Sequence, residues 1–221
     1  MTSFARLKAF DWHEFLGQWS QDFLSSTKYL DQLPRSVRES EWLGFPGTSE
    51  ENIKRAETRL NITLPPSYRD FLKVSNGWRQ TTPFIYRIWS IEEIEWFRER
   101  HQSWIKTFTE ARLKSQNKYQ RKNHNLNGFP KILKIPDSEY YTYGEEQDCS
   151  KIRLEYLNSV IEISEKGESA IYLLNPEVIF ENGEWEAWFL GDWLPGADRY
   201  RSFQELMEAE YENFLEMREA L

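Results

Sequence analysis

The sequence predicts an α+β fold in which helices at the N-terminal side and at the C-terminus pack on an antiparallel β-sheet, with an N-terminal helical extension. Two observations support this class. Apolar residues recur at helical spacing before residue 75 and again after residue 202. From residue 130 the pattern changes to alternation broken by tight turns, which indicates consecutive hairpins of an antiparallel sheet.

The first expected helix lies close to the N-terminus. Asp11 and Glu14 have capping-box spacing, and the apolar residues that follow share one helical face: Trp12, Phe15, Leu16, Trp19 and Phe23. We expect this aromatic stripe to pack on the domain that follows; a docking or dimer helix is the alternative. The segment after it is polar and contains Pro34. We therefore assign residues 1–40 to a helical extension with linker, and residues 41–221 to the main domain.

The stretch from Trp42 to Trp78 predicts two short helices joined by a proline corner. Thr48 and Glu51 have capping-box spacing, Asn61 is a plausible stop, and proline suits the start of the second helix. Asn-Gly can close a helix in the left-handed conformation. These features have an order and spacing that resemble the SMI1/KNR4 (SUKH) superfamily. The residues that carry the resemblance are Trp42, Gly44, Ile53, Ala56, Glu57, Leu60, Leu64, Pro65, Tyr68, Phe71, Leu72, Asn76 and Gly77.

The middle of the chain predicts one strand and one long helix. Residues 84–89 are β-branched and aromatic, as in a strand. Ser90 and Glu93 then have the spacing of a cap for a helix that continues to about Lys114. Residues 112–128 are polar and locally basic, and we interpret them as a solvated loop. An RNA or phosphate contact is the alternative, but Tyr119 is the one aromatic residue there for stacking.

Short strands and a final helix are expected after residue 130. The predicted strands are residues 131–135, a strand lined by Tyr140, Tyr141 and Tyr143, a hairpin of 160–163 with 170–174, and a hairpin of 178–180 with 185–190. Asn182-Gly183 suits the tight turn of the second hairpin. A loop follows over 191–196. Ser202 and Glu205 then cap a helix with a buried apolar stripe and an acidic outer face.

Composition and charge limit the kinds of partner and the location that we expect for the protein. The chain has 36 acidic and 28 basic residues, a formal net charge of −8, which repels nucleic acid and attracts a basic partner. No segment approaches the roughly 18 apolar residues of a membrane helix, and the N-terminus lacks a signal-peptide core. Cys149 is the single cysteine, so no internal disulfide can form. We expect a cytoplasmic protein that contacts neither nucleic acid nor membrane.

Catalytic and cofactor motifs are missing from the sequence. His13, His101 and His124 do not have metal-ligand spacing, and no glycine-rich phosphate loop or nucleophile elbow occurs. Cys149 is flanked by acids, which raise a thiol pKa. We therefore predict no catalytic residue, no metal and no cofactor. Glu57 lies on the apolar side of its helix, so its carboxylate must accept hydrogen bonds, from Trp42 N–H, Tyr68 O–H or backbone amides.

The family resemblance implies a binding protein and not an enzyme. Bacterial members resemble immunity proteins that neutralise polymorphic toxins, often nucleases, whereas fungal relatives are scaffolds in cell-wall signalling. We expect an immunity protein that binds a basic toxin domain; the alternative is an interaction module in a regulatory or cell-wall signalling assembly. Aromatic rings and acids outside the core stripes are the predicted partner-binding residues: Trp78, Trp89, Glu92, Glu95, Trp96, Asp192, Trp193 and Glu205.

Overall fold

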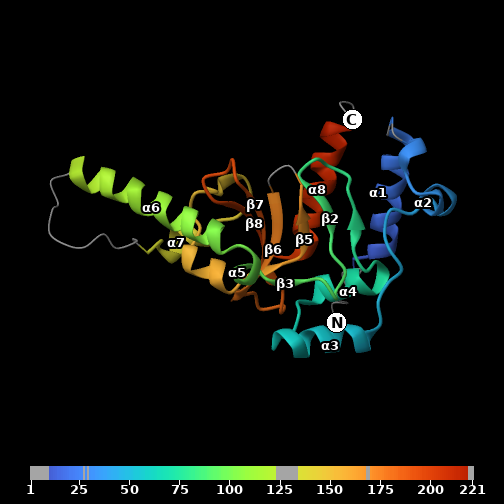
Figure 1. Ribbon diagram of the computed structural model, residues 1–221, viewed down its shortest axis with the longest axis horizontal. Coiled ribbons are helices and arrows are strands. Elements are labelled where there is room, and N and C mark those ends of the chain that lie inside the picture. Colours follow the sequence, from blue (N-terminus) through green and yellow to red (C-terminus); the bar gives the residue numbers. More distant parts are fainter. Residues whose placement is uncertain (1–9, 27, 29, 123–133, 168–169, 219–221) are drawn as a thin grey trace, which may run out of the picture.

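A computed structural model describes residues 10–26, 28, 30–122, 134–167 and 170–218 (Figure 1). The helices are α1 Trp12–Ser26, η1 Leu30–Gln32, α2 Arg35–Ser40, α3 Glu50–Leu60, α4 Pro66–Val74, α5 Phe97–Arg100, α6 Gln102–Lys122, α7 Asp137–Tyr140, η2 Gly144–Glu146, η3 Leu154–Asn158 and α8 Phe203–Met217. The strands are β1 Trp78–Arg79, β2 Ile85–Ile88, β3 Glu95–Trp96, β4 Ile161–Glu162, β5 Ser164–Lys166, β6 Ala170–Ile179, β7 Trp185–Gly191 and β8 Ala197–Tyr200. The predicted α+β class is confirmed.

The strands form two antiparallel sheets. One sheet has the order β3-β4-β6-β7-β8, and the other has the order β1-β2-β5. The long strand β6 pairs with β4 on one side and with β7 on the other, so it belongs to both predicted hairpins. The second hairpin turns at Asn182-Gly183, as predicted, and Gly183 has a φ of +82°. Residues 164–166 lie between the two predicted strands of the first hairpin, where a turn was expected; they instead form β5 and pair with β2.

The five-stranded sheet separates two hydrophobic cores. On β6, Tyr172 and Leu174 enter the core that also contains α1, α3, α4 and α8, whereas Ile171 and Leu173 enter the core against α5, α6 and η3. Figure 1 shows these two groups of helices on opposite sides of the sheet, with the far end of α6 projecting beyond it. The central strands are therefore buried on both faces, which is why they read as nearly continuous apolar runs.

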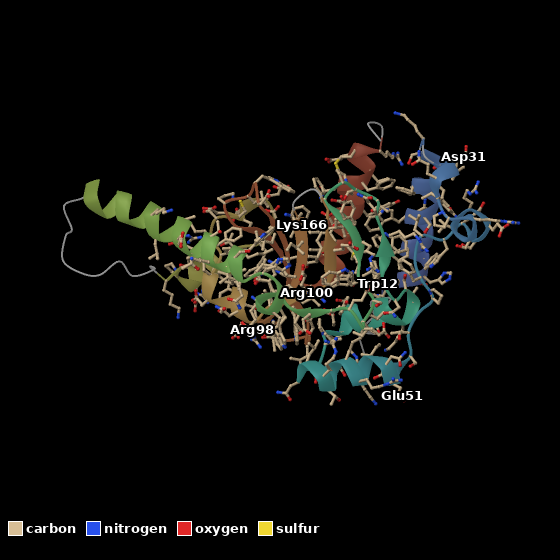
Figure 2. All side chains as sticks on the ribbon, viewed as in Figure 1. Trp12, Asp31, Glu51, Arg98, Arg100 and Lys166 are labelled. Atoms are coloured by element: carbon tan, nitrogen blue, oxygen red, sulfur yellow. The ribbon has the colours of Figure 1, made fainter. Side chains whose placement is uncertain are left out.

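The aromatic stripe of α1 packs on the rest of the chain, as predicted. Trp12 and Trp19 are 4% and 2% exposed. The Trp12 ring lies 5.4 Å from Phe71 of α4 and 5.6 Å from Phe203 of α8. Figure 2 places Trp12 at the end of α1 that faces α4. The extension thus shares a core with the main domain; the division at residue 40 stays a prediction.

The two-helix motif forms largely as its sequence signals predicted. The cap of α3 is Ser49, whose side chain accepts from the Asn52 amide, and not its neighbour Thr48. Asn61 ends α3 in the left-handed conformation, with a φ of 55°. The carboxylate of Glu57 accepts from the Leu64 backbone amide at 2.8 Å and pairs with Arg69.

Two of the donors proposed for Glu57 were wrong. The Tyr68 hydroxyl makes no hydrogen bond with any described residue, and burial raises the pKa of Tyr68 well above its usual value. Trp42 instead stacks its ring on His13, with 5.3 Å between centroids. The backbone amide was predicted correctly, whereas Arg69 was not foreseen.

The segment of residues 90–140 departs most from the predicted secondary structure. Ser90 and Glu93 do form the predicted contact, but it closes a turn, because residues 95–96 pair with β4 and the helix begins only at Phe97. Residues 112–122, expected in a loop, belong to α6; the rest of that segment lies outside the described residues. Tyr140 ends a short helix and not a strand. Of the predicted strand 131–135, residues 131–133 are outside the described part, and 134–135 are not in a strand.

Candidate functional site

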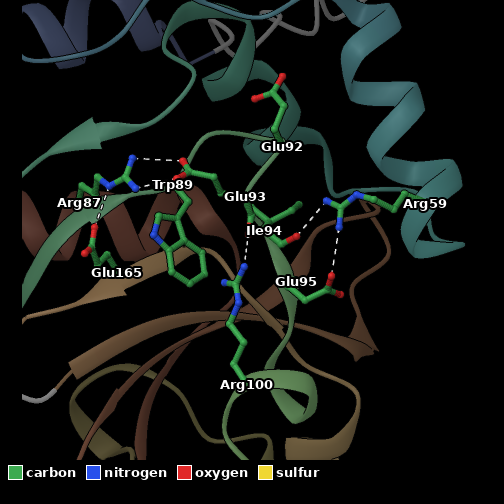
Figure 3. Close-up of a pocket in the computed structure, with 9 residues that line it drawn as sticks. All are labelled: Arg59, Arg87, Trp89, Glu92, Glu93, Ile94, Glu95, Arg100 and Glu165. Atoms are coloured by element: carbon green, nitrogen blue, oxygen red, sulfur yellow. Dashed lines mark hydrogen bonds and ion pairs between the residues drawn. The ribbon is translucent and has the colours of Figure 1, made fainter.

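A polar groove of about 330 Å³ opens where α3, β2, β3, β5 and the turn after β2 meet α5 (Figure 3). Three arginines, four glutamates, a tryptophan and an isoleucine line it: Arg59, Arg87, Trp89, Glu92, Glu93, Ile94, Glu95, Arg100 and Glu165. Because these residues come from five separate elements and the turn that joins β2 to β3, the groove exists only in the folded chain.

Arg87 is the central cation of one wall. Its guanidinium donates to Glu93 at 2.6 Å and to Glu165 at 2.8 Å (Figure 3). The hydrogen bond to Glu165 and the pairing with Glu93 raise the pKa of Arg87. Burial raises the pKa of Glu93, but the hydrogen bonds from Arg87 and Ser90 outweigh it, so the Glu93 pKa is lowered. Both groups are therefore charged at neutral pH and hold each other in place.

The other two arginines fix the opposite wall to the backbone. Arg59 donates to the Ile94 carbonyl oxygen at 2.9 Å and pairs with Glu95 at 3.3 Å. Arg100 donates to the Glu93 carbonyl oxygen at 2.7 Å, and its guanidinium lies 4.1 Å from the centre of the Trp89 ring. Figure 3 shows both arginines reaching towards the segment that joins Glu93 to Glu95.

A buried carboxylate lies behind Arg100. Glu162 of β4 is 1% exposed; it accepts a hydrogen bond from His101 Nε2 at 2.8 Å, and Arg100 lies 3.6 Å from its other oxygen. That second oxygen has no hydrogen-bond partner among the described residues. Figure 2 places Arg100, with Arg98, on α5 between the sheet and α6. His101 thus serves a buried polar contact at the junction of α5 and α6.

The groove has an excess of negative charge. Three arginines and four glutamates give its lining a formal charge of −1, and Glu162 behind it adds another carboxylate. Glu92 is exposed, and no ion pair joins it to any described residue. The Asn76 side chain donates a hydrogen bond to its carboxylate at 3.1 Å. A cation on a partner would therefore meet a carboxylate that no arginine of the described residues neutralises.

The family motif holds the turn that carries Glu92. Besides its contact with Glu92, Asn76 accepts from the Ile91 backbone amide at 2.8 Å. Gly77 has a φ of +111°, and a Cβ there would lie 2.8 Å from the Ile88 carbonyl oxygen. The Asn-Gly pair does not close α4 as predicted, because the C-cap of α4 is Ser75 in an extended conformation; it positions the edge of the groove instead.

Three of the predicted partner-binding residues meet in this groove, namely Trp89, Glu92 and Glu95. Trp96 follows Glu95 on β3 and is half-buried under the guanidinium of Arg98. Trp193, which is 51% exposed, and the exposed Asp192 lie instead on the β7–β8 loop, where Trp193 packs on Phe84. Glu205 is half-buried at the start of α8, where it accepts from the Arg201 amide.

Trp78 is a correction. We expected an exposed ring, but Trp78 is 2% exposed and contacts Trp19 and Trp42 within the core. A partner cannot reach it. The burial of Trp78 was misjudged because the residue directly follows the Asn-Gly turn. The strand that starts there, β1, has only two residues, which is too short to show an alternating pattern in the sequence.

Sequence reasoning did not find the arginines of the groove, nor Glu93 and Glu165 as members of it. Arg59 and Glu95 are 36 residues apart, and Arg87 and Glu165 are 78 apart. The one usable signal was the Ser90–Glu93 spacing, which does form its contact.

The polar lining of the groove is suited to binding a charged group. Among the described residues, no group of three or more histidine, cysteine or acidic side chains is arranged to hold a metal ion. A carboxylate with a lowered pKa, such as Glu93, is a weak proton acceptor. Burial, together with Asp198 and Asp148, raises the pKa of Cys149, as its acidic neighbours predicted. Within the described part of the chain, no helix has the length and apolar character needed to cross a membrane.

Comparison with known proteins identifies the family. No curated protein sequence matches the chain. The model of the SMI1 / KNR4 family (SUKH-1) matches residues 47–216, a range that runs from the turn before α3 into α8 and includes all the residues of the groove. Because this range is well over half of the 221 residues, the protein belongs to the SMI1/KNR4 family (SUKH-1).

Proposed function

We propose that this protein is a non-catalytic immunity protein that neutralises a cognate toxin by binding it one to one. The partner is a toxin domain with a basic surface, and the groove around Glu92 and Trp89 is the centre of the contact. The alternative is an interaction module within a regulatory or cell-wall signalling assembly. Membership of a family known for immunity-type proteins supports the immunity function over the interaction module.

The observation that carries the proposal is the unneutralised carboxylate of Glu92 beside a rigid frame of ion pairs. Arg59 and Arg100 bind backbone carbonyl groups and Arg87 binds the Glu93 carboxylate, so little conformational entropy is lost when a partner binds. Trp89 presents a half-buried ring in the same groove, and such rings anchor many protein interfaces.

Charge also favours a basic partner at long range. With a net charge of −8, the protein attracts a cationic domain before contact and speeds the encounter. At short range the groove is complementary to a positively charged surface, since its lining carries more carboxylates than arginines. A nuclease domain, whose surface must attract nucleic acid, has the required charge.

Co-expression is the first test of the function. The gene is expressed together with the C-terminal domain encoded by its immediate upstream neighbour, and survival and co-purification are scored. We expect the neighbour's domain to be toxic alone and harmless together with this protein, in a one-to-one complex. Toxicity without rescue, or no toxicity, would refute the immunity function and favour the interaction module.

Charge reversal then tests the groove. Glu92→Lys should slow association with the toxin roughly tenfold at low salt and flatten the salt dependence of the rate. Glu181→Lys is the matched control, because it makes the same change in net charge at an exposed turn distant in sequence from the groove. Equal effects of the two substitutions, measured by stopped-flow mixing, would place the contact elsewhere.

A further inference from the structure

A second hollow, of about 580 Å³, lies apart from the groove, between α1, α2 and the entry loop of residues 42–46. His13 of α1, Ser36 and Ser40 of α2, Trp42 and Phe45 of the entry loop, and Arg79 of β1 contribute to its lining. This volume is in the range of small-molecule sites, which are mostly apolar and contain a few fixed polar groups.

Arg79 is the charged group of this hollow. Its Nη1 donates to the carbonyl oxygens of Leu43 and Gly44, each at 2.7 Å, and its guanidinium lies 4.0 Å from the centre of the Phe45 ring. No carboxylate of the described residues forms an ion pair with it, in contrast to Arg59 and Arg87 of the groove. In a chain with 36 acidic residues, this arginine keeps an unneutralised charge.

The charge of Arg79 persists although the side chain is partly buried. Burial lowers the pKa of Arg79, but a guanidinium remains protonated under all ordinary conditions. The two backbone contacts use Nη1 and leave Nε and Nη2 without a hydrogen-bond partner among the described residues. Those two N–H groups form the fork that binds a carboxylate side-on.

The rest of the hollow is aromatic and held in place. The Trp42 ring stacks on His13. It also meets Trp78 edge-on, with 5.9 Å between the centroids of the Trp42 and Trp78 rings. The entry loop itself is fixed to α1, because the Leu43 amide donates to the Ser20 hydroxyl at 3.1 Å. Arg79 and the rings beside it are thus in position before any ligand arrives, which reduces the entropic cost of binding.

We propose that this hollow binds a small monocarboxylate with an apolar body. The carboxylate would pair with the free edge of Arg79, and the apolar body would lie against Trp42 and Phe45. A single arginine matches the one negative charge of a carboxylate, and its two free N–H groups match the two carboxylate oxygens. The inference is independent of the proposed function, since no residue of the groove lines this hollow.

Titration with small carboxylates tests the proposal. Benzoate and hexanoate are added to the full-length, isotope-labelled protein, with benzamide and hexanol as uncharged counterparts, and the resonances of the Trp42 indole N–H and Arg79 Nε–H are followed by NMR. We expect saturable shifts of both resonances with the carboxylates, and binding at least tenfold weaker for the uncharged compounds. Equal binding of charged and uncharged compounds, or shifts that avoid Trp42, would overturn the proposal.

Variants separate binding from folding. Arg79→Met should weaken carboxylate binding at least tenfold, whereas Arg55→Met, at an exposed arginine of α3, should leave it unchanged. Because Arg79 also holds two loop carbonyl groups, Ser40→Trp serves as a second variant that narrows the hollow and keeps the arginine. It should also weaken binding. Unchanged affinity in both Arg79→Met and Ser40→Trp would refute the site.

Discussion

Glu210 offers a sharp test of the core, because it is a carboxylate that folding removes from water. It lies on α8, is 1% exposed, and accepts hydrogen bonds from the Tyr172 hydroxyl and from Asn213 at 2.7 Å. Burial raises its pKa to about 7; the hydrogen bonds from Tyr172 and Asn213 lower it, and the charge of Asp198 raises it. The folded state therefore binds this proton more tightly than the unfolded state does.

The sign of the pH dependence follows from that difference. The stability associated with protonated Glu210 is complete below the unfolded pKa, near 4.5, and is lost as the pH rises through 7. A difference of this size corresponds to about 3 kcal/mol of unfolding free energy, most of it lost between pH 5 and pH 8. Glu210→Gln, which can still accept from Tyr172, should not show this loss.

Urea denaturation at pH 5 and pH 8 measures the effect. We compare the change in unfolding free energy of the wild-type protein with that of Glu210→Gln, and use Glu212→Gln, at an exposed position of the same helix, as the control. The wild-type protein and the control should lose about 3 kcal/mol more than Glu210→Gln over this interval. If the unfolding free energy of all three proteins changed equally between pH 5 and pH 8, the assignment of this pH dependence to Glu210 would be refuted.

Three further predictions concern stability and can be measured by urea denaturation at one pH. Leu16→Ala should cost about 2–5 kcal/mol because Leu16 is fully buried, whereas Leu30→Ala, at a 41% exposed position, should change stability by less than about 0.5 kcal/mol; equal losses would contradict the core. Glu186→Ala should cost about 3–5 kcal/mol because it leaves Arg199 buried without its partner, whereas exposed Glu181→Ala should have little effect; a neutral Glu186→Ala would show that the network adds nothing. Gly47→Ala should cost about 1–3 kcal/mol because its Cβ would lie 1.9 Å from the Lys73 carbonyl oxygen, whereas Gly17→Ala, which meets nothing within 4 Å in α1, should gain up to about 1 kcal/mol; the opposite order would refute the backbone argument.

The elements that could be predicted from the sequence are those with local signals. The cap and stop of α3, the Pro65-Pro66 start of α4, the Asn182-Gly183 hairpin and the Ser202 cap of α8 each depend on residues within a few positions. The cap of α3 was misplaced by one residue because Thr48 and Ser49 are both competent cap residues.

The elements that could not be predicted depend on distant partners. The spacing of Ser90 and Glu93 is the same in a helix cap and in a turn, and the pairing of Glu95 with Glu162 of β4 decides between them. Tyr140 looked like a strand residue, but its hydroxyl reaches Glu186, 46 residues away, from the end of a helix. The groove was only partly foreseen for the same reason, since its aromatic and acidic residues cluster in the sequence and its arginines do not.

The two-sided burial of the five-stranded sheet has a consequence for how its strands align. Sliding β7 by one residue past its neighbours β6 and β8 would send each of its apolar side chains into the opposite core, and that core is apolar as well. Hydrophobicity alone therefore discriminates weakly between the two alignments. Glu186 does discriminate, because its carboxylate meets Tyr140, Tyr143 and Arg199 on one side of the sheet alone. In the slipped alignment it would be buried unpaired at a cost of several kcal/mol, so this charge specifies a single pairing of the strands.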